Sequence, residues 1–259
     1  MKRVLMVLVG AGLAISMSIG CAQSYDLRIE ETLKNMKYKR DLEKNTEAPP
    51  KASNLASEEI YIRAPKGLQG PAKTFAFVVE PGRFDIADTF IDQNKGASLH
   101  ILARSNKPKA KGAATKKGAG PPGPPNAPGG AEEPPPTAAR GDFTADVLEF
   151  LRAAYSTDID PSKIKPVDVN SHGRKGVSYK GVTLDLGEKQ VKIYFHGEKS
   201  GPAQVAMIFE GSKDALKSIS SQIDYSLNSL VLGPKATNFY NGQDEFSAGE
   251  EGPTAPPVF

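Results

Sequence analysis

The histidines, the cysteine and the carboxylates of this sequence do not form a recognisable catalytic or metal-binding motif. His100, His172 and His196 stand singly, and Cys21 is the only cysteine. Zinc and calcium sites need such ligands at short, defined spacings. There is no Gly-x-Ser-x-Gly nucleophile elbow, and Gly118-Ala119-Gly120 lies in a proline tract instead of between a strand and a helix. We therefore expect no metal, no cofactor and no enzymatic activity.

One group of polar and aromatic side chains is the best candidate for a binding surface. Lys192, Tyr194 and His196 alternate with apolar residues and therefore share one side of an expected strand, with Tyr179 on the strand before it. This surface could hold a partner or a small ligand. The alternative interpretation is a sheet face that is solvated or covered by a helix. His100 also falls on a polar position of a strand, where we expect a surface or half-covered imidazole.

A second candidate contact is a basic arm at residues 105–140, which contains nine prolines and six glycines. With almost no large apolar side chain, it cannot bury enough surface to offset its ordering entropy, so we expect it to be disordered. Lysines beside an anionic membrane contribute about 1 kcal/mol each. The arm is therefore either a contact for anionic lipids or polymers or a solvated spacer. Its lysines are Lys107, Lys109, Lys111, Lys116 and Lys117.

Composition excludes several classes of protein. Glycine and proline make up 46 of the 259 residues, which is above the ordinary share and indicates that part of the chain is not packed. The net charge of +3 is too small for a dedicated nucleic-acid binder. A single cysteine excludes a disulfide scaffold, and repeated apolar runs of about 20 residues, as in a multi-span membrane protein, are missing.

The N-terminus has the pattern of a signal peptide. Lys2 and Arg3 precede an uncharged run at residues 4–20, which is short and diluted by glycine and serine, so export is favoured over a permanent membrane span. We assign residues 1–20 to the signal peptide.

The segment that ends this run, Ser18-Ile19-Gly20-Cys21, resembles the lipobox of bacterial lipoproteins, although Ser18 stands where the family usually has leucine. The resemblance implies that Cys21 is lipidated and becomes the first residue of an exported, membrane-anchored chain. Ala22 after the cysteine implies the outer membrane, where one exists. The alternative is ordinary cleavage after Ala22, which would discard the only cysteine and release a soluble protein.

Periodicity predicts the elements that follow. Residues 21–54 comprise the anchor, a helix at 25–44 with a narrow apolar stripe, and a linker at 47–54. Strands are expected at 59–63, 74–79, 98–104, 167–170, 176–184, 190–196 and 204–210. Asp142 should cap an amphipathic helix, and a closing helix should run from Ser212 to Leu230, ended by Gly233-Pro234.

These elements predict one α+β domain at residues 55–235, an antiparallel sheet with flanking helices, interrupted by the disordered arm. A long flexible loop adds little to the entropy of closing the chain, so one core tolerates this insertion. Residues 236–259 are expected to form a disordered acidic tail.

The order of elements resembles the PsbP-like family, from the Pro65-Lys66-Gly67 turn to the strand Val205-Ala206-Met207-Ile208-Phe209-Glu210 and the final helix at 215–230. The resemblance implies an αβα sandwich that binds or supports other proteins without a shared catalytic apparatus. We therefore expect a lipid-anchored cell-envelope protein that acts as a non-catalytic binding or scaffold module with an envelope protein as its partner. The alternative is a carrier or sensor of a small ligand held between sheet and helix.

Overall fold

The computed structural model describes seven parts of the chain, and the expected anchor and residues 107–140 of the expected arm lie outside them. The signal peptide with Cys21, the five arm lysines, most of the expected strand at 74–79 and the tail beyond residue 242 are not described. The described residues are 25–50, 53–72, 77, 79–80, 82–106, 141–172 and 177–242.

Six strands of the described residues form one antiparallel sheet in the order β2-β3-β7-β6-β5-β4. This architecture confirms the predicted α+β class. Two further short strands, β1 (Ile60–Tyr61) and β8 (Val231–Leu232), pair beside it. The strands of the large sheet are β2 (Ile86–Asp92), β3 (Ala97–Ser105), β4 (Lys165–Val167), β5 (Tyr179–Leu186), β6 (Lys189–His196) and β7 (Ala203–Ser212).

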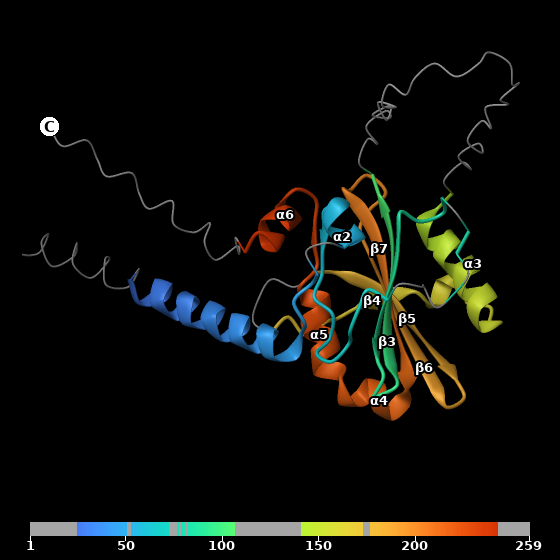
Figure 1. Cartoon of the computed structure of the whole chain (residues 1–259), viewed down its shortest axis with the longest axis horizontal. Coiled ribbons are helices and arrows are strands. Elements are labelled where there is room, and N and C mark those ends of the chain that lie inside the picture. The colour runs from blue at the N-terminus through green and yellow to red at the C-terminus, as the bar shows by residue number, and fades with distance from the viewer. Residues whose placement is uncertain are drawn as a thin grey trace, which may run out of the picture.

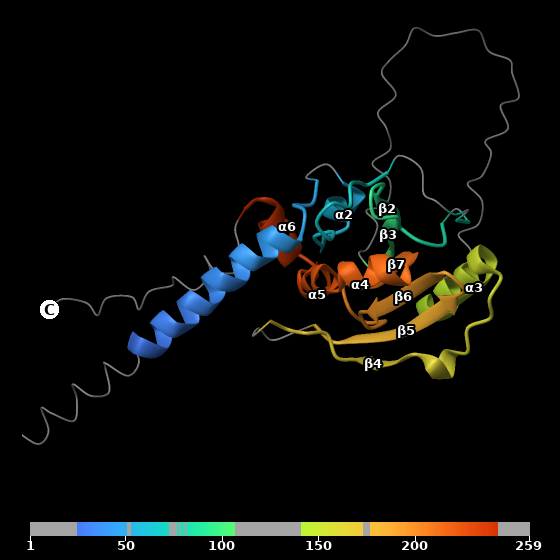
Figure 2. The ribbon, with the colours of Figure 1, turned by 90° about the horizontal axis from the view of Figure 1, so that it is seen from below.

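Helices cover both faces of this sheet, as Figures 1 and 2 show. α3 (Phe143–Tyr155) packs on one face, where Leu102 and Ile208 contribute to its apolar core. α4 (Lys213–Ser218) and α5 (Ser220–Asn228) pack on the other face, with Leu99 and Met207 among its core residues. The alternation of side chains along each strand thus supplies two separate cores.

Short elements complete the domain at its margins. α2 (Asn54–Ser57) and α6 (Lys235–Tyr240) lie beside the β1–β8 pair, and a 3-10 turn, η1 (Pro161–Lys163), precedes β4. α6 lies in the expected tail, beyond the predicted domain end at residue 235. Its Tyr240 is buried and donates a hydrogen bond to the Ile60 carbonyl at 2.9 Å, so the folded unit extends further than the sequence indicated.

Two expected helix starts are confirmed by their caps. The Asp142 carboxylate accepts a hydrogen bond from the Ala145 amide at 3.0 Å, and the Ser212 hydroxyl accepts one from the amide of Ala215. The expected single closing helix is interrupted at Ile219, however. The Ser218 hydroxyl donates to the Ala215 carbonyl, and such local bonds compete with the helical ladder.

The strand assignments need two corrections. β2 was not expected, because Asp88 and Asp92 interrupt the apolar pattern of the segment, although both are buried in the fold. The strand expected at 167–170 lies earlier, as β4, and ends at Val167.

The helix expected at 25–44 is helical over residues 25–45 and projects from the domain (Figures 1 and 2). Its last turns pack on α5, where the buried Tyr38 ring lies 5.9 Å from the ring of Tyr225. The expected linker is tied to the domain as well, because the Glu47 carboxylate accepts hydrogen bonds from Lys66 and the Gly67 amide. None of the helices in the described ranges is long and apolar enough to cross a membrane.

Candidate functional site

The structure brings three of the four predicted surface residues together at one end of the sheet. Tyr194 and His196 lie on the α4–α5 side of β6, and Tyr179 lies beside them on β5. The Tyr179 ring centroid is 6.2 Å from that of Tyr194 and 5.3 Å from that of His196. Lys192 lies further along β6, opposite Thr183. Tyr179 and Tyr194 therefore lie on a sheet face that is covered by a helix, and not on an open binding surface.

Both phenols in this group serve the packing of the helix. Tyr179 is buried and donates a hydrogen bond to the Leu227 carbonyl of α5 at 2.6 Å. Burial raises the pKa of Tyr179 well above its ordinary value. Burial, together with the nearby Asp224 carboxylate, raises the pKa of Tyr194 to about 12. Because both hydroxyls stay protonated near neutral pH, neither can act as a base there.

His196 is half-buried at the rim of a groove. Its Nδ1 lies 2.8 Å from the Ser178 carbonyl oxygen. Because a carbonyl only accepts, Nδ1 must carry the proton, and Nε2 of the neutral ring is a hydrogen-bond acceptor. The groove has a volume of about 810 Å³ and is lined by Tyr179, Phe195 and the Val231–Leu232 strand, among others. It has the polar and aromatic lining that a ligand or an inserted side chain would need.

A second cluster, which the sequence did not reveal, surrounds His100 on the α3 side of the sheet. The imidazole is only 2 % exposed, so the expectation of a surface or half-covered histidine was wrong. Its Nδ1 lies 3.0 Å from the Thr89 hydroxyl, and its Nε2 lies 3.0 Å from the Ser98 hydroxyl and 3.5 Å from the Glu210 carboxylate. The Phe77 ring, at 4.9 Å, helps to close the site.

Glu210 is the centre of this cluster. Its carboxylate accepts hydrogen bonds from the Tyr155 hydroxyl at 2.8 Å and from the Lys189 ammonium group at 3.0 Å. The hydrogen bond with His100, followed by those with Lys189 and Tyr155, lowers the pKa of Glu210 to about 2 although burial opposes the shift. Burial and the Glu210 charge raise the pKa of Tyr155.

This cluster lies at the rim of a hollow of about 380 Å³. It has the residue types of an acid–base site, but the pKa of Glu210 and the hydrogen bonds of the cluster do not suit that role. A general base works best when its pKa is near the working pH, and Glu210 is far below it. Its oxygens and the Tyr155 hydroxyl bond to each other and to other groups of the chain. The arrangement therefore stabilises the fold around α3.

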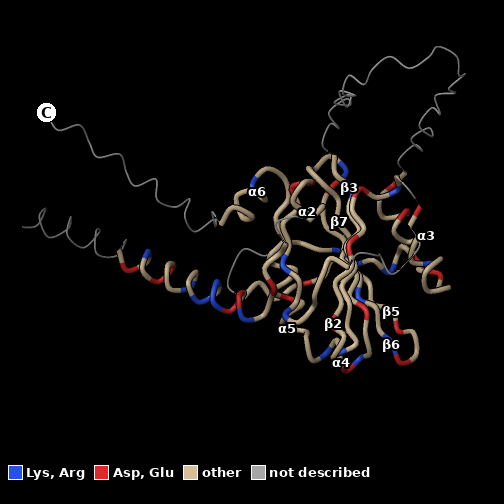
Figure 3. Tube along the Cα trace, viewed as in Figure 1, with Lys and Arg blue, Asp and Glu red and all other residues tan. Residues whose placement is uncertain are grey.

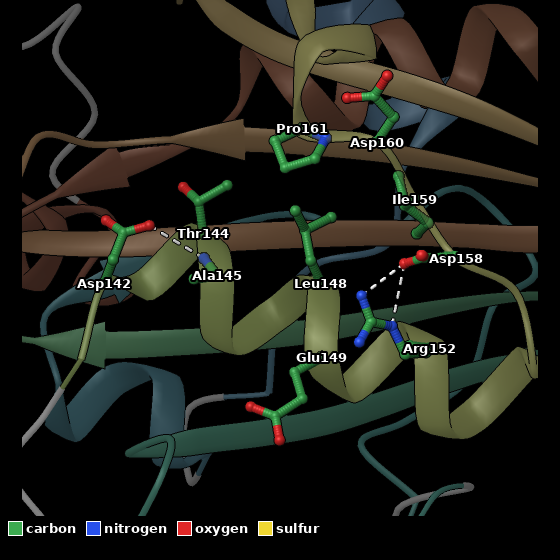
Figure 4. Close-up of a pocket in the computed structure, with 10 residues that line it drawn as sticks. All are labelled: Asp142, Thr144, Ala145, Leu148, Glu149, Arg152, Asp158, Ile159, Asp160 and Pro161. Atoms are coloured by element: carbon green, nitrogen blue, oxygen red, sulfur yellow. Dashed lines mark hydrogen bonds and ion pairs between the residues drawn. The ribbon is translucent and has the colours of Figure 1, made fainter.

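The third site is an acidic groove between α3 and residues 158–161 (Figure 4), with a volume of about 650 Å³. Leu148 points into it, and Arg152 binds Asp158 through Nε at 3.0 Å and Nη2 at 2.5 Å. Asp142 caps α3, and Asp160 accepts from the Ser162 amide at 2.9 Å. Its carboxylates thus have structural roles, and the described part of the chain holds no group of three or more His, Cys, Asp or Glu side chains suited to a metal ion.

The attachment points of the arm are fixed on the domain, although the five arm lysines lie outside the described residues. The Asn106 amide group donates to the carbonyls of Lys199 and Gly201, beside the groove of His196. At the other end, Arg104 donates to the Gly141 carbonyl at 2.9 Å. The fold therefore sets where the arm leaves and rejoins the domain.

Together, fold and sites define an α+β protein with a six-stranded antiparallel sheet between helices. No family model matches the sequence, and no curated protein matches it either. Among solved structures, the solution structure of cyanobacterial PsbP (CyanoP) from Synechocystis sp. PCC 6803 is similar. The two share 12 % sequence identity with a TM-score of 0.35, and the alignment covers 68 % of this chain and 88 % of that one.

Proposed function

We propose that this chain is an exported, lipid-anchored protein of the cell envelope that acts as a binding or scaffold module without catalysing a reaction. Cys21 is its lipid attachment site, in the outer membrane or on the periplasmic face of the envelope where an outer membrane exists. The proposal that the protein is not catalytic rests on one observation, which is that ionisable side chains suited to catalysis are engaged in hydrogen bonds within the fold. The groups that could do chemistry, above all Glu210 and Tyr179, are bonded to the chain itself.

The shape of the surface supports a macromolecular partner. Small-molecule sites usually enclose most of their ligand. The groove of His196 and the groove along α3 are open depressions along the ends and sides of secondary structure, and both are lined by polar and apolar residues. A segment of a partner protein could lie along either, and we assign the partner to the groove of His196 because it has the larger volume and aromatic walls.

Replacement of the cysteine tests the anchor. In cells that express the full chain, Cys21→Ser should move the protein out of the membrane fraction that resists a high-salt wash. Ser24→Ala is the matched control, because it changes the same segment and leaves the lipid attachment site intact. Retention of Cys21→Ser in the washed membranes would show that the uncleaved N-terminal segment, and not a lipid, holds the protein there.

Site-specific cross-linking tests the partner. A photoreactive amino acid at Lys180, on the rim of the His196 groove, should capture one defined envelope protein in native membranes, whereas the same group at Lys217 on α4 should not. Equal labelling from both positions would contradict a partner at this groove. Replacing residues 107–140 by a short glycine-serine linker then shows whether the basic arm makes a secondary contact or is a spacer.

A second candidate function, the carrier or sensor of a small ligand, is favoured by one observation. His196 presents an acceptor nitrogen beside an aromatic groove, which is the pairing of polar and apolar groups that orients a ligand. A ligand that binds only the folded state raises the melting temperature. If an envelope metabolite raises the melting temperature of the full chain and His196→Ala abolishes the increase, the protein is a carrier or sensor. If no metabolite raises it, the binding-module function is favoured.

A further inference from the structure

The helix at residues 25–45 carries an apolar stripe that no described residue covers. Its members follow the spacing i, i+4, i+8 and i+11, which aligns them on one side of a helix. Their exposed fractions are 65 % for Tyr25, 41 % for Ile29, 60 % for Leu33 and 64 % for Met36. We call these four residues the stripe. Exposed apolar side chains gathered in this way mark an interaction surface.

The stripe faces away from the domain. Tyr38, the buried residue that fixes the helix on α5, lies about 140–220° around the helix axis from the members of the stripe at 100° per residue. A flat surface could therefore contact the stripe while the domain stays on the opposite side of the helix. Figures 1 and 2 show that the first turns project freely from the domain.

The length of chain before the helix limits what the stripe can contact. Only residues 22–24 separate Cys21 from Tyr25, so four Cα steps span at most about 15 Å. A lipid on Cys21 would hold the first turn of the helix at the membrane surface. From these observations, which rest on the proposed lipid anchor, we propose that the helix at residues 25–45 lies on the bilayer surface with the stripe among the acyl chains.

The charge of the helix indicates which force would hold it there. Residues 25–45 contain six Lys and Arg residues and five Asp and Glu residues, and Figure 3 shows both signs of charge along the helix. Attraction to anionic head groups is therefore weak, and burial of the stripe should provide most of the binding. This contact should survive high salt.

The spacing of the stripe also argues for lipid over a second copy of this helix. A coiled coil needs an apolar seam sustained over three to four heptads. The stripe spans residues 25–36, which is fewer than two heptads, and its first two steps are four residues each. An isolated helical segment of this length is marginal in water, so a bilayer surface would also stabilise its helical form.

Tryptophan reporters test this orientation. The chain contains no tryptophan, so a single substitution gives an unambiguous signal. We would place Ile29→Trp on the stripe and Glu31→Trp about 200° away in the full chain, purify both from membranes and reconstitute them into phosphatidylcholine vesicles with brominated acyl chains. The Ile29→Trp emission should shift to shorter wavelength and be quenched, and remain so in about 1 M salt, where the Debye length is about 3 Å. The Glu31→Trp emission should stay that of a water-exposed indole.

Each other outcome overturns the proposal in a different way. If both reporters remain water-exposed while the protein floats with the vesicles, the anchor is correct and the helix does not lie on the bilayer. A blue shift without bromine quenching that disappears when the protein is diluted in lipid would show that the stripe pairs with a second copy. If the protein does not float with the vesicles at all, the anchor itself is wrong. Circular dichroism of both variants verifies that they are folded.

Discussion

The two faces of the sheet are stabilised by different forces. On the α3 face, buried charges and hydrogen bonds join the sheet to the helix, through His100 and Glu210 and through the pairing of Arg104 with Asp146 at 2.5 Å. On the α4–α5 face most contacts are apolar. One exception is the hydrogen bond that the Tyr179 hydroxyl donates to the Leu227 carbonyl. The same strands supply both faces, so the difference arises from alternate residues of one sequence.

This difference between the two faces predicts where the stability of the fold should depend on pH. Groups that ionise and pair are concentrated under α3, next to the points where the arm leaves and rejoins the domain. The α4–α5 face supports the N-terminal helix through Tyr38 and Tyr225, and its stability should depend less on pH. The side of the domain that contacts the helix at residues 25–45 is thus the side whose stability should change least with pH.

The largest effect is expected for Arg104, which is 4 % exposed and also donates to the carbonyls of Gly141 and Arg83. Arg104→Met leaves the Asp146 carboxylate without its closest partner, and breaking a buried pair in this way costs about 3–5 kcal/mol. Urea denaturation should show this loss. Arg152→Met, which removes an exposed ion pair with Asp158, is the matched control and should cost less than about 1 kcal/mol. Equal losses would show that burial does not set the contribution of the Arg104–Asp146 pair.

Glu210→Gln should reduce stability by about 1–3 kcal/mol at neutral pH, because Lys189 and His100 lose a charged partner. Since folding lowers the pKa of Glu210 to about 2 from an ordinary 4.5, its contribution is complete above pH 4.5 and disappears as the pH falls toward 2. Thermal unfolding from pH 7 to pH 2 should therefore show the wild type and the variant converging at low pH. Parallel curves would show that the Glu210 charge does not stabilise the fold.

Tyr179→Phe tests the polar contact on the apolar face. Removing the hydroxyl leaves the Leu227 carbonyl without this donor, and the expected loss is about 1 kcal/mol. The loss should be the same from pH 5 to pH 8, because the pKa of Tyr179 lies well above this range. Tyr194→Phe, on the neighbouring strand, should change stability by less than about 0.5 kcal/mol. A loss that varies across this pH range would contradict the assignment.

Asp88 is a further exception on the α4–α5 face, and it should give the smallest effect. It is buried, its Oδ2 has no hydrogen-bond partner within the described residues, and desolvation raises its pKa. Stability should therefore fall as the pH rises through that raised pKa, opposite to the effect of Glu210. Asp88→Asn should stabilise the protein by less than about 1 kcal/mol at pH 7, with a smaller gain at pH 4. A loss at pH 7 would indicate that the carboxylate has a partner in solution.

The elements with strong periodicity could be predicted from sequence. The apolar faces of α3 and of the closing helices repeat at helical spacing, and β3 and β6 alternate clearly. β2 could not be predicted, because its buried acidic residues break the alternation, and their burial depends on residues far away in sequence. The break at Ile219 depends on side-chain bonds of serine that compete with the helix.

The candidate site was predictable in its grouping but not in its chemistry. The alternation of β6 and the preceding strand grouped Tyr179, Lys192, Tyr194 and His196, and the structure brings the two tyrosines and His196 together while Lys192 lies further along β6. That the Tyr179 hydroxyl would bond to α5 depends on packing between segments 48 residues apart. The Glu210 cluster could not be predicted from the sequence, because it depends on the pairing register of β7 with β6 and on the position of Tyr155 on α3.

The most direct test of the anchored-module account is mass spectrometry of the N-terminal peptide of the protein isolated from native membranes. The account predicts a peptide that begins at Cys21 and carries the added mass of lipid on that residue. A mature chain that begins after Ala22, or one that retains residues 1–20 without lipid, would contradict the account and remove the basis for the membrane-bound helix.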